Sequence, residues 1–178
     1  MAFLIILGLI LLAILIWASN DFFNIVYRGF APLFPFFTIN TKMTDLILHS
    51  VTLKPNVTIF ELGAGPAKFL QAAEKIQPQA NLIGIEYSLV PYLIGKFLLK
   101  KVKSNIKLIQ QNLYKTDISH ADLIYCYLIP SMMGKLAEKV KKECRSGTLI
   151  ISYMFSIPGL ELKKTIQNNN ETTYIYEI

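Results

Sequence analysis

The hydrophobic pattern divides the chain into three regions. The run from Ala2 to Ala18 has no charged and no polar side chain, and it is about as short as a helix that crosses a hydrocarbon core can be. The next stretch is rich in phenylalanine and is interrupted by Pro32 and Pro35, so no second spanning helix is expected there. The phenylalanines would lie at headgroup level beside a membrane or cover the core of the domain that follows. The predicted regions are a transmembrane anchor at 1–20, an aromatic linker at 21–37 and a folded domain at 38–178.

In this domain, apolar runs typical of strands alternate with helical patterns. Strands are expected at residues 57–61, 81–86, 106–110, 122–128 and 148–154, and helices at 38–51, 66–77, 89–102 and 131–143. The alternation predicts an α/β fold with a mostly parallel sheet and helices on both of its faces. Two final apolar stretches, Leu160–Thr165 and Thr172–Ile178, are joined by the turn-rich segment Gln167–Asn170. This arrangement predicts an antiparallel hairpin at the end of the sheet.

The most informative local pattern is a glycine turn between the first strand and the helix after it. Glu61 ends the strand, and Gly63 and Gly65 permit a tight turn that lets the backbone approach a ligand closely. Pro66 suits the first position of the helix. A helix that begins directly after such a turn points unpaired N–H groups at whatever is bound there. We therefore interpret the turn as a nucleotide-cofactor site.

Three kinds of cofactor site compete for this turn. A dinucleotide fingerprint needs a small residue where Lys68 stands, and a P-loop needs a Gly-Lys-Ser/Thr sequence that is absent. The third is the S-adenosylmethionine motif, in which an acid ends the strand two residues before a Gly-x-Gly turn. A second acid, Glu86, ends the next strand about 20 residues past the turn, where doubly wound folds place a carboxylate against a ribose. An ordinary strand-turn-helix without a ligand is the alternative, and the second acid makes it less favoured.

The net charge of +6 is concentrated in two blocks of cations, at residues 96–107 and 135–145. Such blocks are usually solvated, and the functional alternative is attraction to anionic lipid, worth about 1 kcal/mol per cation near a membrane surface. Nucleic acid is not expected as a partner, because no recognition motif accompanies the charge. The two cysteines are too far apart in the sequence for a metal pair and the two histidines have no partner pattern, so no metal is expected.

The flanks of the apolar run indicate how the anchor would be used. Nothing basic precedes Phe3, and Trp17 interrupts the best position for signal-peptide cleavage, which favours an anchor that is not cleaved. The nearest cations, Arg28 and Lys42, lie on the C-terminal side of the run. By the positive-inside rule, we expect a single-pass membrane protein whose domain faces the cytoplasm.

Taken together, these motifs resemble the class I S-adenosylmethionine-dependent methyltransferases over about residues 38–178. A closer similarity is to the small membrane-anchored lysine methyltransferases that modify the mitochondrial ADP/ATP carrier and the ATP-synthase c-subunit, and to their prokaryotic relatives. The segments that carry it are Glu61-Leu-Gly-Ala-Gly65, Gly84-Ile-Glu86, Asn112-Leu-Tyr-Lys115 and Ile129-Pro-Ser-Met-Met133. The resemblance implies a Rossmann-like methyltransferase sheet with a C-terminal antiparallel hairpin, preceded by one N-terminal transmembrane helix. It also implies S-adenosyl-L-methionine as the cofactor.

The resemblance assigns cofactor contacts to Glu61, Gly63, Ala64, Gly65, Glu86, Tyr87, Asn112 and Leu113. In this assignment the turn admits the methionine part of the donor, and Glu61 holds its ammonium group through a charge-assisted hydrogen bond. Glu86 holds the ribose hydroxyls, Asn112 accepts from the adenine amino group, and Tyr87 and Leu113 flank the ring. The helix expected at 38–51 would cover the site.

The methyl acceptor is expected beyond the fourth strand, in the crevice where open α/β folds bind ligands. Tyr127 and Tyr114 are the predicted catalytic residues, lining with Tyr125 an aromatic pocket in which desolvation helps a lysine to lose its proton; for all three, packing in the core is the alternative. The sequence therefore predicts a methyltransferase that acts on a lysine of a membrane protein. Two alternatives stay open: a methyltransferase of a lipid-soluble small molecule, and a non-catalytic cofactor-binding module at the membrane.

Overall fold

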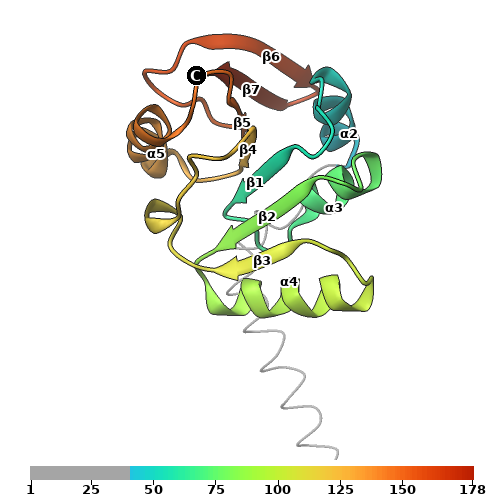
Figure 1. The fold of residues 1–178 in the computed structure, drawn as a ribbon. Helices are drawn as coiled ribbons and strands as arrows, with labels where there is room; N and C mark the ends of the chain where they lie inside the picture. The colour runs from blue at the N-terminus through green and yellow to red at the C-terminus, as the bar shows by residue number, and fades with distance from the viewer. Residues whose placement is uncertain (1–40) are drawn as a thin grey trace, which may run out of the picture. The chain divides into compact units, whose positions relative to one another are not determined.

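The computed structural model describes residues 41–178 of the chain, and its centre is a seven-stranded sheet (Figure 1). The strands are β1 (Thr58–Leu62), β2 (Asn81–Glu86), β3 (Lys107–Gln110), β4 (Leu123–Cys126), β5 (Leu149–Tyr153), β6 (Leu162–Asn168) and β7 (Glu171–Glu177). The helices are α2 (Thr41–Ser50), α3 (Lys68–Ile76), α4 (Leu89–Lys101), α5 (Pro130–Glu143) and a short 3-10 helix, η3 (Leu113–Lys115).

The strand order is β3-β2-β1-β4-β5-β7-β6, with β1 to β5 parallel and β7 inserted antiparallel between β5 and β6. The α/β sheet and its C-terminal hairpin are therefore confirmed. The chain winds outward from β1 to β3 and then returns to β4, which pairs with β1 so that Leu62 lies beside Cys126. The winding reverses between these two strands, and open α/β folds bind ligands at the carboxyl ends of strands at such a point.

Two apolar clusters cover the two faces of the sheet. Alternate residues of β4 show the division, because Leu123 and Tyr125 belong to the first cluster and Ile124 and Cys126 to the second. Helices α2, α3 and α4 pack on the first face, whereas η3 and α5 pack on the second. A stack of the Phe69 and Tyr125 rings, with centroids 3.9 Å apart, joins α3 to the middle of the sheet. The expected helices on both faces are thus present.

Helix α2 is part of the first cluster. Met43 and Ile47, one helical turn apart, are fully buried, and the helix packs beside α3 and against β6. The helical pattern starting near residue 38 is confirmed from Thr41 onward, where the described residues begin. That α2 also covers the cofactor site stays a prediction.

The start of α3 differs from the sequence prediction. Pro66 was expected at the first helical position, but the helix begins at Lys68 because Ala67 adopts a left-handed conformation with φ of 56°. Ala67 is fully buried and its N–H donates to the Ala64 carbonyl at 2.7 Å, so the glycine turn extends through this residue. Tertiary packing has thus selected a conformation that an alanine rarely adopts alone.

One of the cations read as solvated is buried. Lys139 in α5 is 8% exposed, and its Nζ donates to the Thr116 carbonyl at 2.6 Å and forms an ion pair with Glu143. The hydrogen bond to Thr116 connects α5 to the segment after η3. Lys139 therefore stabilises the fold and does not belong to a solvated face.

The predicted anchor at 1–20 and linker at 21–37 lie outside the described residues. Between Thr41 and Ile178, none of the helices has the length and apolar character needed to cross a membrane.

Candidate active site

The glycine turn is held against the end of β2 by backbone hydrogen bonds. The N–H groups of Gly63 and Ala64 both donate to the Ile85 carbonyl, at 2.8 and 3.0 Å. Gly63 has a φ of +76° and Gly65 a φ of +49°, in the left-handed region that favours glycine. A Cβ on Gly63 would also come within 2.7 Å of the Leu128 side chain. The turn therefore requires glycine for both backbone and steric reasons, and its exposed part presents bare backbone to a ligand.

Glu61 lies beneath this turn and occupies the N-terminus of α3. Its side chain is 2% exposed, and Oε2 accepts a hydrogen bond from the Leu70 N–H at 3.2 Å. A pyrophosphate that bound as in dinucleotide sites would need those N–H groups. Since the protein's own carboxylate takes that position, the geometry disfavours a dinucleotide. The contact of Glu61 with the donor's ammonium stays a prediction, and the structure adds a second role, capping α3.

Burial raises the pKa of Glu61 to about 8, with the negative charge of Glu86 adding to the effect and the N–H groups of Leu70 and Phe69 opposing it. The raised pKa favours the protonated form of Glu61 in the ligand-free protein. A cation bound beside this carboxyl would favour its charged form.

The raised pKa predicts a pH-dependent stability. Between the ordinary value of 4.5 and about 8, the native state keeps a proton that the unfolded state has lost. The stabilisation from the protonated carboxyl is complete below the lower value and is lost as pH rises toward the higher one, with a slope of up to about 1.4 kcal/mol per pH unit. Chemical unfolding of the ligand-free protein across this range should show the slope, and Glu61→Gln, which does not titrate, should lack that part of it. Parallel curves for the two proteins would contradict the assignment.

Glu86 joins the glycine turn to the start of α4. Its Oε2 accepts from the Gly65 N–H at 2.9 Å and its Oε1 from the Ser88 N–H at 2.7 Å. Each carboxylate oxygen has two lone-pair sites, so both retain capacity for a ribose hydroxyl. Ser88 stands at the predicted N-cap position of α4, although its side chain makes no capping hydrogen bond. Tyr87 is 72% exposed directly after Glu86, which leaves its ring accessible to a nucleobase.

Gly95, in the middle of α4, is a residue of the site that sequence reasoning missed. A Cβ there would come within 2.5 Å of the Gly65 carbonyl oxygen and 3.2 Å of the Pro66 Cα. The missing side chain therefore lets α4 pack directly on the backbone of the glycine turn. The signal was present in the sequence, because a glycine inside a helical pattern costs about 1 kcal/mol relative to alanine and usually has a packing reason.

The segment after β3 has a strong structural role. The Oδ1 atom of Asn112 accepts from the Tyr114 N–H at 2.9 Å and so caps η3. Leu113 is 6% exposed and packs in the second cluster. The Tyr114 hydroxyl donates to the Met132 carbonyl at 3.2 Å, and the Lys135 Nζ lies 4.3 Å from its ring centroid. These contacts match the packing alternative considered for Tyr114, while the adenine contacts of Asn112 and Leu113 stay predictions.

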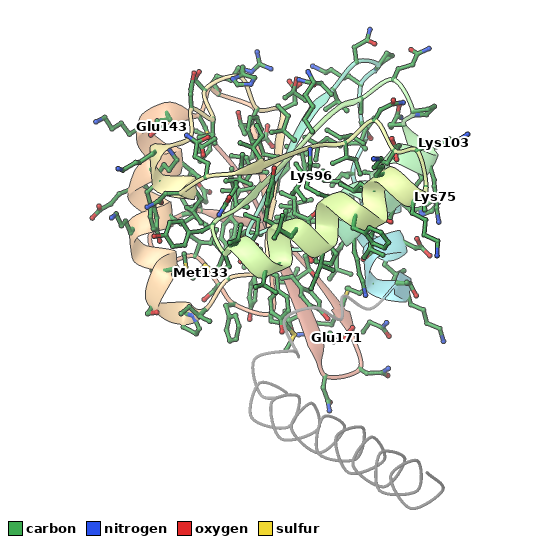
Figure 2. All side chains as sticks on the ribbon, turned by 90° about the horizontal axis from the view of Figure 1, so that it is seen from below. Lys75, Lys96, Lys103, Met133, Glu143 and Glu171 are labelled. Atoms are coloured by element: carbon green, nitrogen blue, oxygen red, sulfur yellow. The ribbon has the colours of Figure 1, made fainter. Side chains whose placement is uncertain are left out.

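Tyr127 lies at the carboxyl end of β4 and meets a partner that the sequence did not indicate. Its ring contacts that of Tyr153 edge to face, with centroids 4.9 Å apart, at the end of β5. Glu171, which Figure 2 labels at the start of β7, is hydrogen-bonded to Tyr153. Burial is the main cause that raises the pKa of Tyr153, and the Glu171 carboxylate adds to it. Burial and the charge of Glu171 likewise raise the pKa of Tyr127. The rings of Tyr127 and Tyr153 and the carboxylate of Glu171 thus lie together near the point where the winding of the sheet reverses, between β1 and β4.

The two predicted catalytic tyrosines are not brought together. Tyr127 packs against the first cluster and Tyr114 against the second, on opposite faces of the sheet. Tyr125 is fully buried beneath the site, and its hydroxyl has no hydrogen-bond partner among the described residues. Burial raises the pKa of Tyr125 most, and the negative charge of Glu61 raises it further. Glu61, Glu86 and Tyr127 therefore lie on the face of the sheet that α3 covers. The buried hydroxyl of Tyr125 lies below them.

Metal ligands are not gathered anywhere in residues 41–178, since no group of three or more His, Cys, Asp or Glu side chains there could hold an ion. His49 bonds the Asp45 carbonyl at 2.7 Å, and His120 packs edge to face on Phe60. Both contacts are structural ones.

Comparisons with known proteins give the same fold and chemistry. An RNA methyltransferase from Salinibacter ruber, solved with S-adenosyl-L-homocysteine, has a similar structure, with a TM-score of 0.74 at 22% identity over 79% of this chain and 93% of that one. A protein-lysine N-methyltransferase of Saccharolobus islandicus (strain REY15A) is 23% identical over 156 residues, 84% of this chain and 97% of that protein. A mitochondrial ribosomal RNA small subunit methyltransferase of Arabidopsis thaliana is 27% identical over 129 residues, 66% of this chain but 32% of that protein. The family described as the ANTKMT methyltransferase domain matches residues 61–164, more than half of the chain. The chain belongs to this family, and it is an S-adenosylmethionine-dependent methyltransferase.

Proposed function

We propose that this methyltransferase acts on the side-chain amine of a lysine in a membrane protein. The lysine methyltransferase of Saccharolobus islandicus, which aligns over most of both chains, supports the choice of acceptor. The observation that carries the proposal is the group formed by Tyr127, Tyr153 and Glu171 at the carboxyl ends of β4 and β5. It offers an aromatic surface and a carboxylate to a cationic side chain beside the cofactor turn.

The chemistry requires two things of Tyr127, Tyr153 and Glu171. They must first bind a charged lysine and then favour its neutral form. Bound S-adenosylmethionine supplies a methyl group on a positively charged sulfur, which only an amine with a free electron pair can attack. Aromatic rings attract an ammonium group, and the Glu171 carboxylate can accept a hydrogen bond from it. Both contacts favour the charged form, and removal of water by Tyr127 and Tyr153 opposes them by lowering the pKa of the amine from its usual value of about 10.4. The amine releases its proton to solvent water before it attacks the methyl group. Positioning of the amine then does most of the catalytic work.

The membrane part of the proposal rests on the sequence. The apolar run from Ala2 to Ala18 would hold the enzyme at a bilayer, and the cations at Arg28 and Lys42 favour a catalytic domain on the cytoplasmic side. An enzyme fixed in this way meets acceptors that are themselves in the membrane. A lipid-soluble small molecule would be served by the same arrangement, so it remains the second candidate.

The test is to incubate the full-length protein with membranes and methyl-labelled donor, and then to separate protein from organic extract. We expect label in protein, recovered as methyllysine after hydrolysis. Glu171→Gln should raise the KM for the protein acceptor about tenfold, the size of a lost hydrogen bond to a charged group, and leave donor affinity unchanged. Glu177→Gln is the matched control, because it changes an exposed acid at the other end of β7 that pairs with Lys163.

Other outcomes identify the alternatives. Label confined to the organic extract would replace the lysine with a lipid-soluble acceptor, and label in RNA would move the substrate to the class named for the Arabidopsis relative. Donor binding without transfer to any fraction would indicate a non-catalytic module. Equal effects of Glu171→Gln and Glu177→Gln would remove Glu171 from the acceptor site.

A further inference from the structure

Helix α4 exposes apolar side chains where a helix on a sheet normally exposes polar ones. Only Gly95 and Leu99 of this helix are buried. Phe97 is 68% exposed and Val90 is 66% exposed. The other exposed large apolar residues of the helix are Leu89, Leu93, Ile94 and Leu98. These six residues, called here the α4 outer face, recur at spacings of three and four and therefore form one continuous stripe.

The charged residues of α4 and of the segment that follows it, as far as Lys115, all have one sign. Between Glu86 and Asp117 the chain contains no acid. The cations in this interval are Lys96, Lys100, Lys101, Lys103, Lys107 and Lys115. Figure 2 looks onto α4, with Lys96 along the helix and Lys103 beyond its C-terminal end. An apolar stripe bordered by lysines is complementary to a surface with anionic groups outside and apolar groups beneath.

We propose that the α4 outer face lies on an anionic lipid surface, as an interfacial helix. Its apolar side chains would enter the boundary between headgroups and acyl chains, as amphipathic helices do in the membrane plane. Lys96 beside the stripe and Lys100 and Lys101 at its C-terminal end have long apolar stems and would reach the phosphate groups. The inference does not depend on which acceptor is methylated.

The lysines beside the α4 outer face disfavour three other occupants: a second copy of the chain, residues 1–40 and nucleic acid. In a two-fold contact between copies, the same surface patch meets itself, so the lysines of both copies would be brought together. Residues 1–40 are mostly apolar, and their charged residues are one acid, Asp21, and one cation, Arg28, which do not complement the lysines. Nucleic acid would leave its phosphates against aliphatic side chains that cannot hydrogen-bond them.

The position of α4 connects this face to the cofactor site. The helix starts two residues after Glu86, and Gly95 on its inner side lies against the Gly65 backbone. In Figure 1, α4 runs along the edge of the sheet formed by β3 and starts at the end where the arrowheads of β1, β2 and β3 lie. Contact of the outer face with lipid would therefore hold the carboxyl ends of these strands close to the membrane surface.

The experiment places a fluorescent probe on α4 in the full chain. The sequence contains one tryptophan, Trp17, so Trp17→Phe gives a background in which Phe97→Trp is the single probe. The protein is reconstituted into phosphatidylcholine vesicles with or without phosphatidylglycerol, using lipids brominated on the acyl chains as quenchers. Leu162→Trp in the same background is the matched control, because Leu162 is an apolar residue 49% exposed on β6, the strand at the opposite edge of the sheet.

We expect bromolipids to quench the probe of Phe97→Trp, with a blue-shifted emission, and to leave that of Leu162→Trp unchanged. Adding Lys100→Glu and Lys101→Glu should reduce the quenching in anionic vesicles, and high salt should do the same. Equal quenching of the two probes would overturn the proposal. A blue-shifted probe on α4 that bromolipids do not quench would also overturn it, since it would show protein, from residues 1–40 or a second copy, on the α4 outer face. Methyl transfer measured on the same samples reports separately on the proposed function.

Discussion

Gly65→Val is expected to abolish the stabilisation of this protein by S-adenosylhomocysteine. In the wild type, a ligand present at about 100 times its Kd adds about 2.7 kcal/mol to the free energy of unfolding. Gly65 is buried with a φ of +49°, and its N–H donates to the Glu86 carboxylate. A β-branched side chain disfavours that backbone conformation and would occupy space next to the ligand. The shift of the melting temperature with added S-adenosylhomocysteine, and with NAD as a negative control, is the measurement.

A control is needed because the substitution can also destabilise the fold. Gly134→Val serves as the matched variant, since a Cβ on Gly134 in α5 meets no heavy atom within 4 Å. It should retain the full ligand-induced shift. Circular dichroism and the melting curve of ligand-free Gly65→Val must show a folded protein; should it be unfolded, Gly65→Ala, which is smaller, replaces it. A normal shift in a folded Gly65 variant would contradict the role of the turn.

Glu86→Ala should weaken donor binding about 5- to 150-fold, corresponding to about 1–3 kcal/mol for lost hydrogen bonds to a charged group. The structure adds a second effect that sequence reasoning did not expect. Because Glu86 also accepts from the Gly65 and Ser88 N–H groups, its removal leaves two backbone donors without their acceptor. The melting temperature of the ligand-free protein should therefore fall as well. Calorimetric titration with the donor and ligand-free melting curves measure the two effects separately.

Glu74→Ala is the matched control for Glu86. Glu74 also accepts two hydrogen bonds, from the Ser104 hydroxyl at 2.8 Å and the Asn105 N–H at 2.7 Å, but it lies in α3 and ties that helix to the loop before β3. Its replacement should lower the melting temperature and leave donor affinity unchanged. Equal losses of affinity in the two variants would show that the effect of Glu86 is only structural.

The order of the strands and helices and the glycine turn could be predicted from the sequence. Both depend on local properties. The period of apolar residues distinguishes strands from helices over a few residues, and the requirement of Gly63 and Gly65 for positive φ is a property of each residue alone. Glu61 and Glu86 could be identified because each ends an apolar strand, and parallel strands bring their carboxyl ends to one edge of a sheet.

The tertiary structure alone decided contacts between residues far apart in the chain. Tyr153 and Glu171 join Tyr127 because β7 pairs antiparallel with β5 in a particular register, and the sequence pattern does not contain that register. Ala67 adopts a left-handed conformation, moving the start of α3 to Lys68, because its surroundings outweigh its own preference. Similarly, Gly95 acquires its role only where α4 crosses the glycine turn.

Helix α4 also shows that the sequence predicts an element whereas the tertiary structure decides which of its sides is exposed. The sequence determined that residues 89–101 form a helix with apolar residues around most of its circumference and lysines among them. Such a helix is normally buried on all sides, and nothing in its sequence pattern indicates which side remains uncovered. The sheet order places β3 at the edge, so α4 packs on the sheet through Gly95 and Leu99 and leaves Val90 and Phe97 in contact with solvent. Local pattern determines which element forms, whereas its exposed surface depends on neighbours that only the folded chain brings together.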